Sequence, residues 1–142
     1  MWVLSVKRIA FAMLFLMTFC SQLVADTITI SVPLGVTTVL DAYRAECAEN
    51  GGEGEIELDG DEVSKLWTDE GEEAYVIRAA FTCDNIGHIW CGVNGCPTQI
   101  ILNDDVYETN RILRKSPNRI SKKQDGTLTY WLPDGKQFDV GK

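Results

Sequence analysis

Alternating apolar and polar positions predict several short strands along the chain. Residues 26–35, "DTITISVPLG", place Ile28 and Ile30 between threonine and serine, and they predict a first strand that ends at a proline and a glycine. Residues 73–83, "EAYVIRAAFTC", have the same period of two and predict a longer strand that ends at Cys83. Shorter antiparallel strands, separated by Asn-Asp-Asp, Gln-Asp-Gly and Pro-Asp-Gly turns, are predicted at "PTQIILND", "VYETNRIL", "NRISK", "TLTYWL" and "KQFDV".

One segment has a helical period instead. Leu40, Tyr43 and Cys47 recur on one face of a helix, which a pair of glycines ends. Thr37 or Thr38 is the expected N-cap of this helix. The pattern places Cys47 on the buried face, close to the predicted strands. The fold class is therefore α+β, with one N-terminal helix packed on an antiparallel sheet or meander.

Residues 1–25 have the pattern of a signal peptide. Lys7 and Arg8 precede the apolar run "IAFAMLFLMTFC", and the small residues of "SQLVA" follow it. The run is shorter than the ~20 residues that cross a bilayer as a helix. We expect cleavage after Ala25, with retention as an anchor as the alternative. Cleavage leaves residues 26–142 as a single exported domain, periplasmic or secreted, with no membrane span.

Export to an oxidising compartment determines whether the cysteines form disulfides. Cys47, Cys83, Cys91 and Cys96 remain after cleavage, and an even number in an oxidising compartment predicts two disulfides. Three connectivities are possible. We favour Cys91–Cys96, because the intervening "GVNG" supplies two glycines for a tight turn, and this leaves Cys47–Cys83. A zinc site built from the last three cysteines and His88 is the alternative, but the paired C-x2-C spacing of structural zinc sites is absent.

The short ring closed by Cys91–Cys96 has two interpretations. It contributes no large core side chain, so it is a candidate for a rigid, exposed contact loop, ordered before it binds. The alternative is that the ring only ends one strand and starts the next. The candidate contact residues are Trp90, Gly92, Val93, Asn94 and Gly95.

Residues 53–73 are strongly acidic, with ten carboxylates and the single base Lys65. Asp59, Asp61 and Glu70 fall at positions 1, 3 and 12 of an EF-hand-like loop, which makes them candidate calcium ligands. Position 5 of that loop is the apolar Val63, so we favour a solvated strand edge and loop. We expect no cofactor.

Basic residues gather in the last third of a chain that is acidic overall. The net charge of −8 becomes −10 when Lys7 and Arg8 leave with the signal peptide. Nucleic acid is therefore not an expected partner. We expect the acidic segment to lie near the basic hairpin, in one molecule or between two. The basic residues are Arg111, Arg114, Lys115, Arg119, Lys122, Lys123 and Lys136.

Two resemblances follow from these motifs. Residues 41–103, with a strand that ends in Cys83 and then "CGVNGCP" before an apolar strand, resemble small exported bacterial proteins that have a "C…CGxxGC" core and no assigned activity. That resemblance implies the fold and the compartment. The C-x4-C loop ahead of a strand is also similar to the one that Ivy-type periplasmic lysozyme inhibitors insert into the enzyme's cleft. Their loop carries a histidine, whereas His88 lies outside this ring.

These patterns together predict a binding protein whose partner is an envelope or extracellular protein, with no catalytic constellation. One alternative is an Ivy-type enzyme-inhibitor module. The other is a calcium-binding or acidic-site enzyme, because carboxylate pairs within residues 53–73 could serve general acid–base chemistry.

Overall fold

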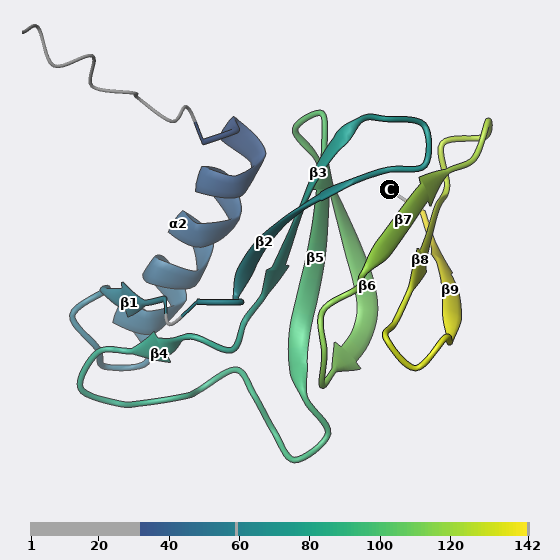
Figure 1. Ribbon diagram of the computed structural model, residues 1–142. Coiled ribbons are helices and arrows are strands. Elements are labelled where there is room, and N and C mark those ends of the chain that lie inside the picture. The colour runs from purple at the N-terminus through teal and green to yellow at the C-terminus, as the bar shows by residue number, and fades with distance from the viewer. Residues whose placement is uncertain (1–31, 59, 142) are drawn as a thin grey trace, which may run out of the picture. The chain divides into compact units, whose positions relative to one another are not determined.

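The computed structural model describes residues 32–58 and 60–141. The predicted signal peptide, most of the predicted first strand and Asp59 lie outside these residues. Figure 1 shows the helix and the series of short strands that these residues form. They are α2 (Leu34–Glu49), β1 (Ile56–Glu57), β2 (Val63–Trp67), β3 (Glu73–Arg78), β4 (Thr82–Cys83), β5 (Cys96–Leu102), β6 (Asp105–Leu113), β7 (Arg119–Lys122), β8 (Leu128–Trp131) and β9 (Gln137–Val140).

The helix begins earlier than the sequence predicted. Pro33 is its N-cap, and the expected caps Thr37 and Thr38 lie inside its first turns, where their hydroxyls donate to the Leu34 carbonyl over 2.9 and 2.8 Å. The free N–H of Gly35 is instead satisfied by Asp104, whose Oδ1 accepts it at 3.0 Å from the β5–β6 turn. A residue distant in the sequence therefore replaces the local cap.

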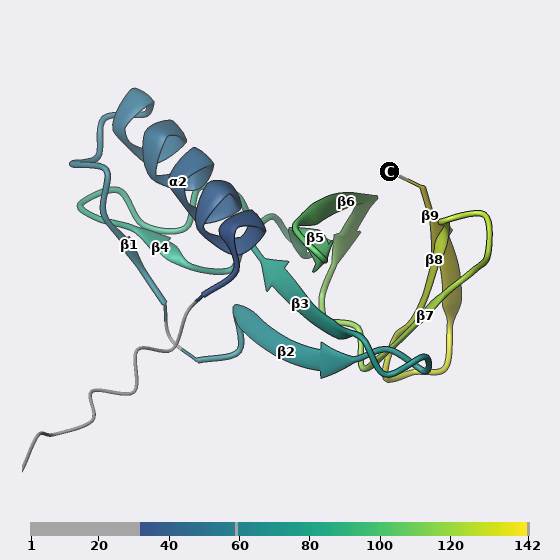
Figure 2. The same ribbon diagram turned by 90° about the horizontal axis from the view of Figure 1, so that it is seen from above.

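The strands form three antiparallel sheets rather than one meander. The central sheet has the order β2-β3-β5-β6, the second has the order β7-β8-β9, and β1 pairs with β4. The two faces of the central sheet are covered by different layers, as Figure 2 shows: α2 lies on one face and the β7–β9 sheet on the other. The predicted α+β class, one helix with antiparallel sheets, is confirmed.

Successive side chains along β3 and β5 point to opposite faces of the central sheet. They contribute to two hydrophobic cores, one between this sheet and α2 and one between this sheet and the β7–β9 sheet. Ile77 and Ile101 belong to the apolar cluster that includes the helix residues, whereas Val76 and Ile100 belong to the cluster shared with β7, β8 and β9. All four side chains are almost completely buried. The period of two thus distributes apolar side chains to two interfaces, which is typical of a strand covered on both faces.

The predicted long strand at residues 73–83 is interrupted after Arg78. Its last two residues form β4, which pairs with β1 and brings Cys83 to the end of α2. The Cys47–Cys83 disulfide joins the helix to β4, and both cysteines are fully buried. A Cβ at Gly52 would lie 2.6 and 2.7 Å from the two sulfur atoms, so only glycine fits beside this bond.

The second disulfide joins Cys91 and Cys96, so the favoured connectivity is confirmed. The predicted zinc alternative is wrong, because its three cysteines are divided between two disulfides. Two intramolecular disulfides indicate an oxidising, non-cytoplasmic compartment. Among the residues that the structure describes, no helix has the length and apolar character needed to cross a membrane.

Candidate functional site

The Cys91–Cys96 ring is a tight, closed turn at the surface. Gly92 and Gly95 exchange two backbone hydrogen bonds across it, with N···O distances of 2.9 and 3.0 Å. The disulfide closes the same loop. Val93 at the tip is 91% exposed, the highest value among the exposed large apolar side chains of the described residues. The ring therefore presents an apolar tip on a backbone that is held from both ends.

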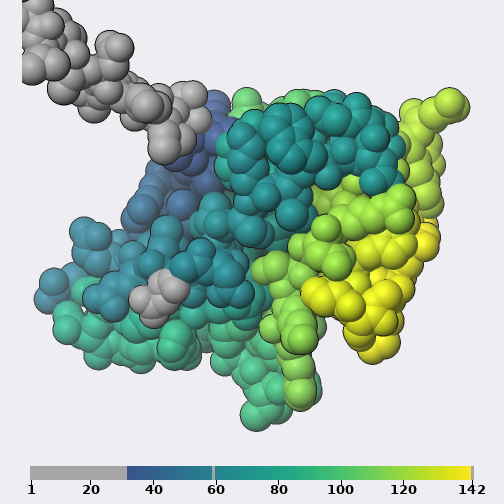
Figure 3. All heavy atoms as spheres, in the orientation of Figure 1, coloured from purple at the N-terminus to yellow at the C-terminus, as the bar shows by residue number. Residues whose placement is uncertain are grey.

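The ring is also fixed against the end of β6. A Cβ on Gly95, whose φ is +127°, would lie 2.7 Å from the Arg114 nitrogen and closer still to the Leu113 carbonyl, so glycine allows the two backbones to touch. Arg114 Nη2 in turn donates to the Val93 carbonyl over 3.0 Å. In Figure 3 the β4–β5 connection and the chain after β6 lie together at the lower edge of the view.

Trp90 differs from the other predicted contact residues. It is half-buried and packs edge-to-face on Tyr43 and Phe81, with ring centroids 5.2 and 5.1 Å away. Trp90 thus belongs to the helix-side core and holds the base of the ring. The exposed candidates are Gly92, Val93 and Asn94.

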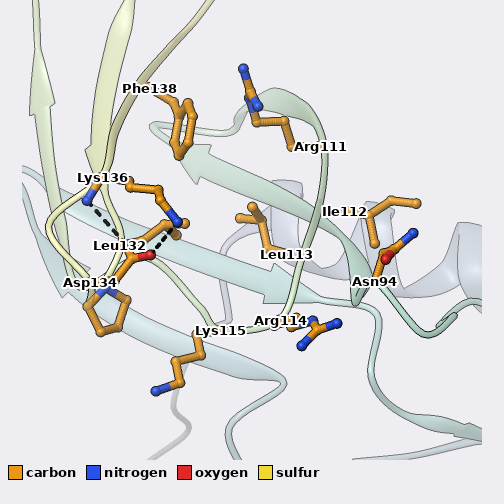
Figure 4. Close-up of a pocket in the computed structure, with 11 residues that line it drawn as sticks. Asn94, Arg111, Ile112, Leu113, Arg114, Lys115, Leu132, Asp134, Lys136 and Phe138 are labelled. Carbon is orange, nitrogen blue, oxygen red and sulfur yellow. Dashed lines mark hydrogen bonds and ion pairs between the residues drawn. The ribbon is translucent and has the colours of Figure 1, made fainter.

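A groove of about 520 Å³ lies beside the ring. Its walls are Asn94 of the ring, the end of β6 with the residues after it, and the β8–β9 turn (Figure 4). The lining combines apolar and basic side chains: Asn94, Arg111, Ile112, Leu113, Arg114, Lys115, Leu132, Pro133, Asp134, Lys136 and Phe138.

A bulge in β6 shapes one wall of this groove. Pro97 pairs with Ile112 and Gln99 with Glu108, so residues 109–111 lie opposite Thr98 alone. Asn110, at the centre of the bulge, has a left-handed φ of +50°. Such bulges redirect side chains near the end of a strand.

Two contacts fix the bulge and its neighbour. The Thr109 hydroxyl lies 2.8 Å from the carbonyl oxygen of Thr98 and 3.1 Å from that of Arg111. The Arg111 guanidinium carbon lies 4.1 Å from the centre of the Phe138 ring, a cation–π contact between β6 and β9. The bulge thus places a guanidinium over an aromatic face in the groove.

The charges of the groove are unlike those elsewhere. Within the described residues, every lysine and arginine outside the groove forms an ion pair. In the groove, Lys136 pairs with Asp134 at 2.8 Å. Arg111, Arg114 and Lys115 form none of the ion pairs found among the described residues. Three positive charges with no ion-pair partner among the described residues therefore lie along one short stretch of an acidic protein.

The other half of the basic cluster is neutralised as the sequence predicted. Arg119 pairs with Asp69 at 2.7 Å, and Lys122 pairs with Glu72 at 3.3 Å. Glu70 accepts hydrogen bonds from the Ser121 hydroxyl at 2.7 Å and the Lys122 N–H at 3.0 Å. The expectation that the acidic segment lies near the basic hairpin in the same molecule is confirmed for these residues.

Two of the candidate calcium ligands, Asp61 and Glu70, have protein partners, whereas Asp59 lies outside the described residues. Asp61 pairs with Arg78 at 3.2 Å. Glu70 is held by the Lys122 N–H and the Ser121 hydroxyl, which lower its pKa to about 2. Glu70 therefore serves as an attachment point for the hairpin, and Asp61 as the partner of a half-buried arginine.

Two other features could have carried chemistry. Cys47, Cys83 and Asp84 lie close together, but the sulfurs form a disulfide, and the Asp84 carboxylate accepts the N–H groups of Glu53 and Glu55. This group therefore closes a loop around the disulfide.

His88, the second feature, is exposed, and its Nδ1 lies 3.3 Å from the carbonyl oxygen of Phe81.

Comparisons with known proteins give no family for this chain, because no family model, no curated protein and no solved structure matches it. The resemblances to "C…CGxxGC" proteins and to Ivy-type inhibitors stay predictions. The groove was not predicted from the sequence. Its one visible signal is "NRILRK", where three basic residues and an asparagine interrupt an otherwise regular strand pattern.

Proposed function

We propose that this is an exported protein, periplasmic or secreted, that acts by binding another protein of the envelope or the extracellular space. The ring closed by Cys91–Cys96 is the contact loop in this proposal, and no catalytic step is part of it. The observation that carries the proposal is the 91% exposure of Val93 on a ring that is closed by a disulfide and packed on β6. An apolar tip on an ordered loop loses little conformational entropy on binding.

The geometry also suits one of the alternatives, an inhibitor that inserts a loop into an enzyme's cleft. The ring is narrow, because only four residues separate its cysteines, and it projects at the end of a strand. In this alternative the partner is an enzyme and Val93 enters its cleft.

The test is crosslinking in cells of the native source. A photoreactive amino acid replaces Val93, and in a matched control it replaces Gln124, an exposed residue in the β7–β8 turn. We expect one discrete adduct from position 93 only. Excess purified wild-type protein should suppress it, whereas the variant Val93→Asp with Asn94→Ala should not. Equal adducts from both positions, or equal competition by the variant, would contradict the contact loop.

The competing variant must remain folded for this test. Val93 and Asn94 are exposed, so their substitution should change the free energy of unfolding by less than about 1 kcal/mol. Urea unfolding of both proteins checks this condition.

A further inference from the structure

Three cations of the groove have no ion-pair partner within residues 32–58 and 60–141. A chain with 21 acidic and 13 basic residues has more than enough carboxylates to pair each base. Arg111, Arg114 and Lys115 nevertheless lie together in the groove, outside the ion pairs found among the described residues. Neighbouring like charges repel, so this arrangement destabilises the free protein. A local rule broken in this way, without an evident gain for the fold, is typical of a functional site.

The groove also has an apolar surface. Leu113 is buried below it, Leu132 and Phe138 are half-buried, and Ile112 is 56% exposed at the rim. Figure 4 shows Leu113 near the centre of the lining, with the basic side chains around it. A ligand that matches this surface carries negative charge and an apolar group together.

Arg111 indicates which kind of anion fits. Its guanidinium lies over the Phe138 ring, and this contact holds the guanidinium in place. The N–H donors at the edge of the guanidinium can then bind a partner that lies in the guanidinium plane. Guanidinium donors match a planar carboxylate in a bidentate manner. The groove is lined by strands and turns, without the helix N-terminus that often receives phosphate. A carboxylate is therefore the better match.

The groove continues into the ring. Asn94 belongs to both, and Arg114 lines the groove while it donates to the Val93 carbonyl of the ring. One ligand can therefore touch the exposed apolar tip and the unpaired cations at the same time.

We propose that the ring and this groove form one binding surface for an acidic segment of a partner protein, with carboxylates at Arg111, Arg114 and Lys115 and an apolar side chain over Ile112 and Leu132. The proposal rests on the ring being the contact loop, and it adds the chemistry of the partner. Complementary charge of this kind raises the association rate and selects among partners more than it adds to affinity.

The test uses the purified, disulfide-bonded protein and three fluorescent peptides of equal length: (Glu-Glu-Leu)4, (Glu-Glu-Ser)4 and (Lys-Lys-Leu)4. We expect (Glu-Glu-Leu)4 to bind with a dissociation constant below about 100 μM at low ionic strength. The serine peptide should bind about tenfold more weakly, and the lysine peptide should not bind. Raising the salt from about 0.1 to about 1 M should weaken binding, since it shortens the Debye length from about 10 to about 3 Å.

Variants assign the binding to the groove. Arg111→Gln with Lys115→Gln should weaken (Glu-Glu-Leu)4 binding at least tenfold, and neither residue contacts the ring through a hydrogen bond found in the described residues. Arg114→Gln should also weaken it, with a further effect through Val93. The matched control is Arg119→Gln with Lys122→Gln, which also removes two positive charges, both already neutralised by Asp69 and Glu72. That variant should bind within twofold of the wild type.

Several outcomes would overturn the proposal. Two results would remove the groove from the site. One is no binding of (Glu-Glu-Leu)4, and the other is equal binding by the Arg111→Gln/Lys115→Gln and Arg119→Gln/Lys122→Gln variants. Tighter binding to phosphatidylglycerol vesicles than to the peptide assigns the cations to a lipid surface instead. The contact loop can fail while the groove remains a binding site. In that case the Val93→Asp/Asn94→Ala variant still suppresses the partner adduct at position 93, and the wild-type protein still binds (Glu-Glu-Leu)4.

Discussion

The helix and the β7–β9 sheet cover opposite faces of the central sheet, and they are attached to their neighbours by different means. The helix shares no backbone ladder with any strand, and the Cys47–Cys83 disulfide ties its C-terminal half to β4. The β7–β9 sheet has its own ladder and no disulfide. The Asp69 N–H donates to the Ile120 carbonyl over 3.0 Å, and the acidic turn after β2 adds the charged contacts.

This difference has a physical reason. A 16-residue helix is marginal in water by itself, because nucleation is unfavourable and only its packed face stabilises it. An antiparallel sheet of three strands forms from local turns and can add to an existing edge. The element that lacks shared backbone hydrogen bonds is the one with the covalent link. On the helix side, which is α2 with β4, stability should therefore depend on the redox state of the Cys47–Cys83 disulfide. On the hairpin side, which is the β7–β9 sheet, stability should depend on packing and pH.

The largest effect is expected from removal of the helix-side disulfide. Cys47→Ala with Cys83→Ala releases a loop with a sequence separation of 36, which lowers the free energy of unfolding by about 4 kcal/mol in the chain-entropy estimate. The matched control, Cys91→Ala with Cys96→Ala, opens a separation of only 5 and should lose about 2 kcal/mol. Urea unfolding measures both. A larger loss from the ring pair would reverse the assigned roles.

On the hairpin side, the largest loss in the free energy of unfolding is expected from a substitution in the hydrophobic core. Ile120 is fully buried between β7–β9 and the central sheet, so Ile120→Ala should lower the free energy of unfolding by about 3 kcal/mol. The loss should be the same with and without a reductant, relative to the wild type under the same condition. Gln124→Ala, in an exposed turn of the same sheet, is the control and should change stability by less than about 0.5 kcal/mol. A loss below that of the control would mean that this layer is not packed on the core.

The sequence predicted the parts of this arrangement that depend on local periodicity. Leu40, Tyr43 and Cys47 are buried on one helix face as the period required, and the even cysteine count with the Gly-rich ring led to the correct pairing. The helix start was wrong, because its free N–H finds Asp104 in a distant turn.

The groove depends on register in the same non-local way. The bulge at residues 109–111 arises from the register in which β6 pairs with β5. The fold brings carboxylates to Arg119 and Lys122 but not to Arg111 or Arg114 among the described residues. Neither fact is encoded in the spacing of residues along one strand. The candidate contact loop, in contrast, could be proposed because its disulfide closes locally.

A smaller effect is expected from the polar contact on the helix side. The Tyr43 hydroxyl donates to Gln99 Oε1 at 3.1 Å and lies 2.8 Å from Gln99 Nε2, in a buried position. Tyr43→Phe keeps the ring against Phe81 but leaves the amide with one partner fewer, which should lower the free energy of unfolding by about 1–2 kcal/mol. The double variant Tyr43→Phe with Gln99→Leu should recover part of this loss. Failure of the second substitution to recover any stability would place the effect in packing rather than in the hydrogen bond.

The smallest effect concerns Glu70, the polar contact of the hairpin side. Its hydrogen bonds from the Lys122 N–H and the Ser121 hydroxyl hold its pKa at about 2, below the ordinary value of 4.5. As the pH falls from about 5 to about 2, the unfolded chain takes up a proton at this residue before the folded protein does, so protons favour unfolding. The contribution of Glu70 is therefore complete above about pH 5 and is lost by about pH 2. Because the side chain is exposed, we expect it to be at most about 1 kcal/mol.

Other carboxylates also have lowered pKa values, among them Asp139 and Asp134, so the wild-type curve alone does not isolate Glu70. Glu70→Gln removes the titration while it keeps an acceptor oxygen for Ser121. The difference in free energy of unfolding between wild type and Glu70→Gln should then shrink as the pH is lowered from 6 to 2 in urea unfolding experiments. Gln124→Ala, at an exposed position in the β7–β8 turn, exchanges no ionisable group and should give a difference that stays constant. A Glu70→Gln difference that is equally flat would show that this carboxylate does not hold the hairpin, and packing alone would then account for its attachment.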